Sequence, residues 1–268
     1  MNVAFVIYPG FTALDLTGPY EVISRWPGAE VRFVATTMDP VRCDRGLTVL
    51  PTDTPATIGR PELIVVPGSE HPLPVLEDRC LVSWIADAAP GCRWTASVCT
   101  GAGLYAAAGL LGDKTVTTHW GFRDPLRAMG VTVSPDRVVW DGRHISGAGV
   151  SAGIDLALTL TERVFGRPLA ETLQLVIEYD PQPPFDAGDP EKVDAGTLRM
   201  ALRILLGDRP LRAAARIQRH GVAARLARAR AAAVAAARRG HAASRPAPRR
   251  RPPPRSPAPT RGPRRRGR

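Results

Sequence analysis

Short β-branched runs alternate with longer segments of helical periodicity, and this alternation constrains the fold more than any other feature. The runs that favour strands are residues 3–8, 29–36, 62–68, 93–98, 114–119 and 137–147. The helical patterns cover residues 12–26, 80–89, 100–111, 121–130, 151–166 and 168–180. Apolar strands that alternate with helices are typical of a mostly parallel sheet covered on both faces. We therefore expect an α/β three-layer sandwich, with a hairpin where Asp141-Gly142 separates two β-prone runs.

The charge of the chain divides at about residue 207. Residues 207–268 contain 19 arginines and a single acid, Asp208, whereas residues 1–206 contain 17 basic and 24 acidic residues. The formal net charge of +11 therefore describes a tail rather than the surface of a domain. We predict one folded domain over residues 1–206 and a mostly disordered Ala/Arg/Pro-rich tail over residues 207–268. The tail is either an arm that binds polyanions weakly or a drifted or frame-altered end.

The cysteines and the N-terminus indicate the compartment. The four cysteines form no C-x-x-C pair and no regular framework, which is typical of a reduced, cytosolic protein. The first segment, MNVAFVIYPG, has no basic region before its apolar run, so we expect no signal peptide. No window approaches the ~18 apolar residues that a membrane span needs. We expect a cytoplasmic protein that has no membrane segment.

Cys99 stands between a strand pattern, RWTASV, and a helical pattern, TGAGLYAAAGLL. A turn of this kind presents its side chain at the carboxyl edge of the sheet, where open α/β folds bind ligands. The free N–H groups of a helix N-terminus favour a thiolate there, and Gly101 lets the backbone approach a ligand closely. We predict that Cys99 is a nucleophile. The alternative is a buried structural thiol, the role assigned to the other cysteines, Cys43, Cys80 and Cys92.

Two further segments follow strand patterns and reach the same sheet edge. Asp15, in PGFTALDLTGP, lies between two leucines and is either a partner of the thiol or a cap of its helix. The turn after Pro67 offers the N–H groups of Gly68 and Ser69 as oxyanion donors, although glycine is common in turns. Thr100 either contacts the ligand through its hydroxyl or N–H group or caps the helix that it begins. These side chains are the candidates for a site around Cys99.

Four segments together resemble the ThiJ/PfpI superfamily, which has the class I glutamine-amidotransferase-like fold, and within it the isonitrile hydratases most closely. They are SVCTGAGLYAAAGLLGDKTVTTHW, LDLTGPYEV, GVSAGIDLAL and EYDPQPPFDAGDPEK, and the match spans about residues 3–195. The S-V-C-T-G and T-T-H-W elements are shared with amidase-like domains of AraC-type regulators, whereas L-D-L-T-G-P-Y and P-P-F-D-A-G favour the hydratases. The resemblance implies a homodimeric hydro-lyase that needs no metal and no cofactor.

The resemblance also implies residue roles: Cys99 as the nucleophile, Asp15 as the acid beside it and Thr100 as a supporting contact. Thr100 stands where the protease-like branch has a histidine directly after the nucleophile. A Cys-His peptidase dyad at that position is therefore excluded.

A second departure from the family pattern concerns the turn after Pro67. The usual Gly-Gly is Gly68-Ser69 here, so the Cβ of Ser69 narrows the approach to the ligand, and His71 places a base at the mouth of the site. His119 is expected to be a packed, hydrogen-bonded histidine at a strand end, with a catalytic role as the alternative.

The implied reaction adds water to an isonitrile, R–N≡C, and yields an N-substituted formamide. The terminal carbon is electrophilic and has no leaving group, so the reaction needs a soft nucleophile and an acid. Thiolate Cys99 and protonated Asp15 supply this pair through a thioimidate, and a partly apolar crevice should raise the pKa of Asp15. Two alternatives remain: another ThiJ/PfpI-type thiol hydrolase or glyoxalase-like enzyme, and a non-catalytic ligand-sensing domain related to AraC-type regulators.

Overall fold

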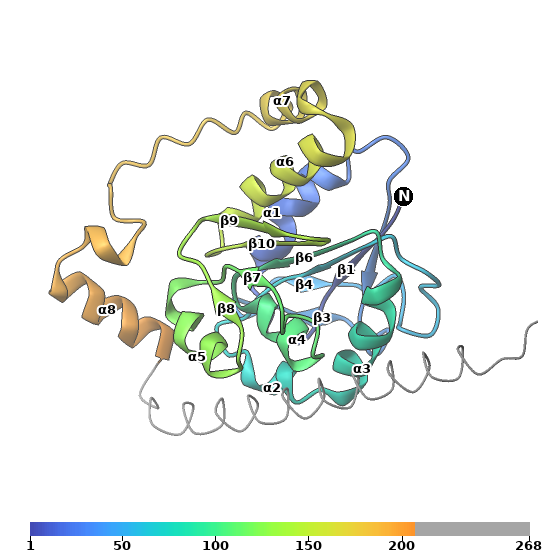
Figure 1. Cartoon of the computed structure of the whole chain (residues 1–268), viewed down its shortest axis with the longest axis horizontal. Helices are drawn as coiled ribbons and strands as arrows, with labels where there is room; N and C mark the ends of the chain where they lie inside the picture. The colour runs from blue at the N-terminus through green and yellow to red at the C-terminus, as the bar shows by residue number, and fades with distance from the viewer. Residues whose placement is uncertain (207–268) are drawn as a thin grey trace, which may run out of the picture. The chain divides into compact units, whose positions relative to one another are not determined.

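A six-stranded sheet forms the centre of the structure, a computed structural model that describes residues 1–206 (Figure 1). In order across the sheet, the strands are β2 (Glu30–Val34), β1 (Asn2–Val6), β5 (Leu63–Val66), β6 (Trp94–Val98), β10 (His144–Gly147) and β9 (Val138–Asp141). The first five run parallel, and β9 pairs antiparallel with β10. The mostly parallel sheet and the hairpin at Asp141-Gly142 are thus confirmed. The tail predicted over residues 207–268 lies outside the described residues.

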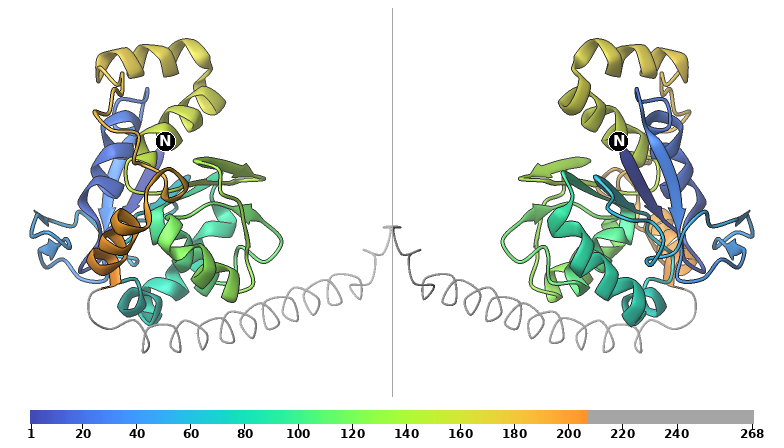
Figure 2. Two further views of the ribbon diagram at one scale, coloured as in Figure 1. Left: turned by 90° about the vertical axis from the view of Figure 1, so that its left-hand side faces the viewer. Right: turned by 90° about the vertical axis from the view of Figure 1, so that its right-hand side faces the viewer.

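Helices cover both faces of this sheet, as the two side views in Figure 2 show. On one face α1 packs against α6, and α7 packs against α6 in turn; on the other face α4 contacts α2, α3 and α5. Their bounds are α1 Ala13–Ile23, α2 Leu73–Leu76, α3 Arg79–Ala88, α4 Ala102–Ala107, α5 Arg123–Ala128, α6 Ala152–Phe165 and α7 Arg167–Val176. The predicted three-layer sandwich is confirmed.

The burial of the strands follows from this layering. All four residues of β5 and four of the five residues of β1 are buried, as central strands covered on both faces require. Strand β2 lies at an edge of the sheet and alternates between exposed and partly buried side chains until Val34. Helix α1, which carries Asp15, packs closely on α6. Gly153 permits this close approach because it has no side chain: a Cβ there would lie 2.9 Å from Pro19 Cδ.

The segment 114–119 differs from its prediction as a strand of the main sheet. Only Thr115–Val116 form a strand, β7, which pairs with β8 (Thr132–Val133) in a separate two-stranded sheet. The reason lies in the two threonines that follow. The N–H group of Thr117 donates to Ser146 Oγ, and the hydroxyl of Thr118 donates to the Cys99 carbonyl. These bonds direct the backbone toward the turn at Cys99 instead of along a strand.

Several elements were not predicted. Strands β3 (Val41–Arg42) and β4 (Thr48–Val49) form a small antiparallel ribbon. Helix α8 (Ala195–Leu206) follows a long extended segment after α7 (Figure 1). The single-turn 3-10 helices are η1 Ala89–Gly91, η2 Cys99–Gly101, η3 Trp120–Phe122 and η4 Pro190–Lys192. Within residues 1–206, no helix combines the length and the apolar character that crossing a membrane would require.

Candidate active site

Cys99 occupies the turn between β6 and the helical segment η2–α4, at the carboxyl edge of the sheet. Its φ is 58°, in the left-handed region that a residue with a Cβ adopts rarely. Two buried hydrogen bonds hold this conformation. The Cys99 N–H group donates to the Ala148 carbonyl (2.8 Å), and its carbonyl accepts the Thr118 hydroxyl (2.6 Å). The predicted strand–cysteine–helix turn is present, and its backbone strain is typical of functional sites.

Asp15 lies in the first turn of α1 and is fully buried, although Leu14 beside it is 42 % exposed. Its Oδ2 accepts the N–H group of Gly68 at 2.8 Å, and the Cys99 thiol lies beside the same carboxyl and interacts with it. The N-cap of α1 is Thr12, and Asp15 accepts a bond from another loop rather than from its own helix. The alternative that Asp15 caps its helix therefore does not hold.

Burial controls the protonation of this pair. Desolvation raises the pKa of Asp15 to about 7; the Gly68 N–H group and the thiol lower that pKa, and Asp44 raises it. Burial, followed by the charge of Asp15, raises the pKa of the Cys99 thiol well above its usual value. One N–H group, that of Thr100, lowers this pKa. The raised pKa of Asp15 agrees with the prediction. The predicted resting thiolate does not, because one N–H group does not offset burial of the sulfur beside a carboxylate.

The turn after Pro67 is tied to both sides of the pair. The Gly68 N–H group donates to Asp15, and the Ser69 N–H group donates to Thr100 Oγ1 at 2.8 Å. The Thr100 hydroxyl in turn donates to the Ser69 carbonyl at 2.9 Å. Both predicted oxyanion donors are therefore engaged within the protein in this arrangement. The Thr100 side chain therefore holds this turn through two hydrogen bonds to Ser69 and does not cap a helix.

Two glycines are required by close backbone contacts. A Cβ at Gly68 would lie 2.5 Å from the Thr100 nitrogen and 2.8 Å from Asp15 Oδ2. A Cβ at Gly101 would lie 2.3 Å from the Val66 carbonyl oxygen. Gly101 was predicted to let a ligand approach the backbone closely. Instead, the end of β5 occupies the space that a side chain at residue 101 would need. Both glycines therefore serve to bring the turn at Cys99 against the loop that follows β5.

Two polar groups near the pair were not predicted. Tyr8 is buried and donates its hydroxyl to the Pro67 carbonyl at 2.7 Å; burial, then the charges of Asp15, Cys99 and Asp44, raise its pKa. Asp44, in the loop between β3 and β4, accepts the Thr12 hydroxyl at 2.7 Å. Tyr8 is the last residue of the first predicted strand run and lies two residues after the end of β1, so its position was a usable signal. Asp44 follows no strand of the main sheet, and nothing in the sequence pattern distinguishes it.

The two candidate histidines have different environments. His71 is exposed, and its backbone N–H group donates to Ser69 Oγ at 3.1 Å. His119 Nδ1 accepts the N–H group of Gly121 at 3.1 Å, and its ring packs against Trp120. Burial, followed by the charge of Arg123, lowers the pKa of His119. His119 is thus a neutral, hydrogen-bonded histidine with its proton on Nε2, the packing role expected of it.

The other cysteines divide into two groups. Cys43 and Cys92 are buried, as predicted, and the Cys92 thiol donates to the Pro61 carbonyl at 3.1 Å. Burial raises the pKa of Cys92 to about 11. Cys80 is exposed, so its assignment as a buried structural thiol is wrong. It lies at the second position of α3, outside the apolar face that this amphipathic helix buries through Leu81 and Ile85.

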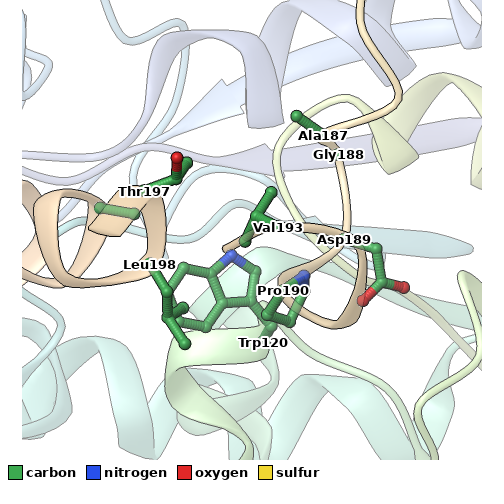
Figure 3. Close-up of a pocket in the computed structure, with 9 residues that line it drawn as sticks. Trp120, Ala187, Gly188, Asp189, Pro190, Val193, Thr197 and Leu198 are labelled. Carbon is green, nitrogen blue, oxygen red and sulfur yellow. The ribbon is translucent and has the colours of Figure 1, made fainter. Parts of the chain in front are cut away.

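A cavity of about 90 Å³ lies where the chain around α8 passes over Trp120 (Figure 3). The Trp120 indole lies between Leu198 and Pro190, with Val193 nearby, whereas the Asp189 carboxyl points away from the ring. The residues of the Cys99–Asp15 pair do not line this cavity. Among residues 1–206, no group of three or more His, Cys, Asp or Glu side chains is arranged to hold a metal ion.

Comparisons with known proteins identify the family of the chain. The profile of the DJ-1/PfpI family matches residues 1–163, which include Asp15, Gly68 and Cys99. Isonitrile hydratase of Pseudomonas putida is 40% identical over 191 residues, covering 71% of this chain and 84% of that protein. The transcriptional regulator CdhR of Pseudomonas aeruginosa is 27% identical over 175 residues, but the match covers only 51% of the regulator. The crystal structure of a ThiJ/PfpI family protein from Pseudomonas syringae superposes with a TM-score of 0.76 and 32% identity, covering 82% of this chain and 89% of that one.

Proposed function

The chain belongs to the DJ-1/PfpI family, and we propose that it hydrates isonitriles to N-substituted formamides. The observation that carries this proposal is the buried Cys99–Asp15 pair, in which a thiol and a carboxyl of pKa about 7 lie side by side. The 40% identity to the isonitrile hydratase of Pseudomonas putida supports the substrate class.

The first step is addition of the thiol to the terminal carbon of the isonitrile. Just above neutral pH the pair holds one proton, mainly on the sulfur, because the pKa of Asp15 is about 7 and that of Cys99 is much higher. As the sulfur–carbon bond forms, Asp15 accepts the thiol proton and then passes it to the same carbon. The product of this step is a thioimidate, R–N=CH–S–Cys99, and Asp15 is again a carboxylate.

The second step is hydrolysis of the thioimidate. Water adds to the former isonitrile carbon while Asp15 takes a proton from it and delivers that proton to the nitrogen. The carbon–sulfur bond then breaks, the remaining hydroxyl proton returns to the sulfur, and R–NH–CHO leaves. One isonitrile and one water are consumed for each formamide, and the thiol and carboxylate are regenerated.

The engaged N–H groups of Gly68 and Ser69 support hydration over acyl transfer. Hydrolysis of an amide or ester places negative charge on oxygen, and enzymes stabilise it with free hydrogen-bond donors. Addition to an isonitrile places the charge on carbon, which the proton on Asp15 neutralises. Here the two N–H groups are bound to Asp15 and Thr100. The site thus has an acid where an isonitrile needs it, and its candidate oxyanion donors are occupied.

The test is incubation with cyclohexyl isocyanide, with formamide followed by chromatography. We expect turnover by the natural chain, loss of turnover in Cys99→Ala, and retained turnover in Cys92→Ala, which removes another buried thiol away from the pair. Methylglyoxal and a small thioester are offered in parallel. Turnover of either without formamide production would favour another activity of the family. Saturable isocyanide binding with no product from any substrate would favour a ligand-sensing domain.

A further inference from the structure

Asp44 is connected to Asp15 by a short series of hydrogen bonds. Asp44 Oδ2 accepts the Thr12 hydroxyl at 2.7 Å, and the Asp44 N–H group donates to the Phe11 carbonyl at 2.9 Å. Thr12 in turn accepts the Asp15 N–H group (3.1 Å) on its carbonyl and donates its own N–H group to the Gly68 carbonyl (2.8 Å). The loop between β3 and β4 is thereby fixed against the start of α1.

Within residues 1–206, the Asp44 carboxylate forms no ion pair. Asp44 Oδ1 is buried and has no hydrogen-bond partner within residues 1–206. The neighbouring cation, Arg45, is paired with Glu70 instead. The Thr12 hydroxyl does not cap α1; it donates to the Asp44 carboxylate instead. A carboxylate held rigidly and without a counterion acts on the ionisable groups around it.

Three ionisable groups face this carboxylate, each from a different element. They are Asp15 on α1, Cys99 at the turn after β6, and Tyr8 after β1. Burial is the main cause that raises the pKa of each, and the charge of Asp44 adds a smaller contribution in the same direction. For Asp15 this effect adds to that of burial and opposes that of the Gly68 N–H group. A carboxylate with an ordinary pKa is too weak a base to take a proton from a buried thiol.

We propose that Asp44 is a positioning residue of the site: its fixed carboxylate makes Asp15 a stronger base, so that Asp15 can accept the Cys99 proton during attack. This role deepens the proposed hydration and rests on it for the identity of the substrate. Asp44 itself forms no bond to the reacting atoms. Its effect is electrostatic and is transmitted through Asp15.

The test compares Asp44→Asn with the natural residue, both in a Cys80→Ser chain so that the exposed thiol does not react. Removal of the charge should move the acidic limb of the pH profile of cyclohexyl isocyanide hydration down by up to about half a pH unit. It should lower kcat at the optimum by up to about threefold, because Asp15 is then a weaker base, with little change in KM. Asp44→Glu restores the charge and should return the limb toward its original position.

A second readout needs no isonitrile. Loss of the charge lowers the pKa of the thiol as well, so Cys99 in Asp44→Asn should be alkylated by iodoacetamide up to about threefold faster at mildly alkaline pH. Turnover should thus fall while alkylation becomes faster. A substitution that only loosened the structure would leave the pH profiles unshifted and would not produce these opposite changes. The matched control is Asp39→Asn: Asp39 also accepts a threonine hydroxyl, that of Thr37 at 3.0 Å, and acts on none of the three groups.

The two proposals fail separately. If the natural chain makes no formamide, isonitrile hydration is overturned, and the alkylation comparison still decides the role of Asp44. If Asp44→Asn melts like the natural chain and keeps both its acidic limb and its alkylation rate, the role of Asp44 is overturned. Should Asp44→Asn not fold, Asp44→Ser removes the same charge with a smaller side chain and is measured in its place.

Discussion

The Asp15 carboxyl is the point at which the demands of folding and chemistry conflict. It is fully buried, and within residues 1–206 only the N–H group of Gly68 and the thiol interaction compensate for its lost hydration. Its pKa of about 7 means that the native state retains a proton that the unfolded chain has already released. The same shift that suits Asp15 to proton transfer therefore costs stability near neutral pH.

Asp15→Asn should separate these two effects. Asparagine has the same size and still accepts the Gly68 N–H group, but it cannot shuttle a proton, so turnover should fall by about 10²- to 10⁴-fold. Because the pKa of Asp15 is raised in the native state, the stability it confers at low pH is lost as pH rises from about 4 to about 7, a difference of up to about 4 kcal/mol. The variant should therefore gain stability relative to the natural chain above neutral pH. Denaturant unfolding of both chains across this range measures the difference, and parallel curves would contradict the assignment.

The thiols should differ in reactivity according to their exposure. Cys80 is exposed, whereas Cys99 is 5 % exposed and its pKa is raised. Because alkylation requires an accessible thiolate, iodoacetamide should label Cys80 before Cys99 in the native protein. Peptide mass spectrometry over a time course measures the order. Faster labelling of Cys99 would show that the helix N-terminus ionises its sulfur despite burial.

At the scale of elements, the site depends on how closely β5 and the turn after β6 approach. The side chain of Cys99 is displayed by a strained backbone that Ala148 and Thr118 hold from either side. Opposite it, the loop after β5 meets this turn through Gly68 and Gly101, where a Cβ has no room. The geometry of the pair is therefore a property of two loops packed together.

Gly101→Ala tests this packing. The new Cβ would lie 2.3 Å from the Val66 carbonyl oxygen, so the two loops must separate. We expect a loss of about 1–3 kcal/mol in unfolding free energy and a lower kcat, because Asp15 and Cys99 then move apart. Gly91→Ala is the matched control, since a Cβ at Gly91 would have no neighbour within 4 Å. Equal melting temperatures and turnover for the two variants would contradict the requirement for glycine at residue 101.

At the scale of the whole molecule, the two parts of the chain have opposite charge. Residues 207–268 carry 19 arginines against one acid, whereas residues 1–206 carry 17 basic and 24 acidic residues. Every residue assigned to the site lies within residues 1–206. The homodimer implied by family resemblance stays a prediction that light scattering in solution would measure.

Truncation after Leu206 should leave isonitrile turnover unchanged and reverse the net charge from +11 to −7, as isoelectric focusing would show. The complete chain should bind DNA or RNA weakly, without sequence preference and with a steep loss on adding salt, because clustered arginines release counterions but read no bases. Sequence-specific and salt-tolerant binding would contradict this prediction and favour a relationship to regulators.

The positions of the principal elements could be predicted from the sequence because hydrophobic periodicity depends on residues that are neighbours in the chain. Thr117 and Thr118 show where this reasoning ends. Their segment has the pattern of a strand, but distant partners, Ser146 and Cys99, draw its backbone away from the sheet. Tyr8 was identifiable by its place after β1, whereas Asp44 owes its role to a loop that only folding brings beside α1.

The sequence by itself determined that Asp15, Gly68 and Cys99 share one edge of the sheet, because each follows a strand and parallel strands end at a common edge. Only the tertiary structure decided which of these groups holds a proton and which N–H groups are free. A pKa and a hydrogen-bond partner depend on burial and on distances between loops that are far apart in the sequence. For that reason the helix N-terminus at Cys99 predicts a thiolate, whereas the folded protein holds a protonated thiol beside an acid of raised pKa.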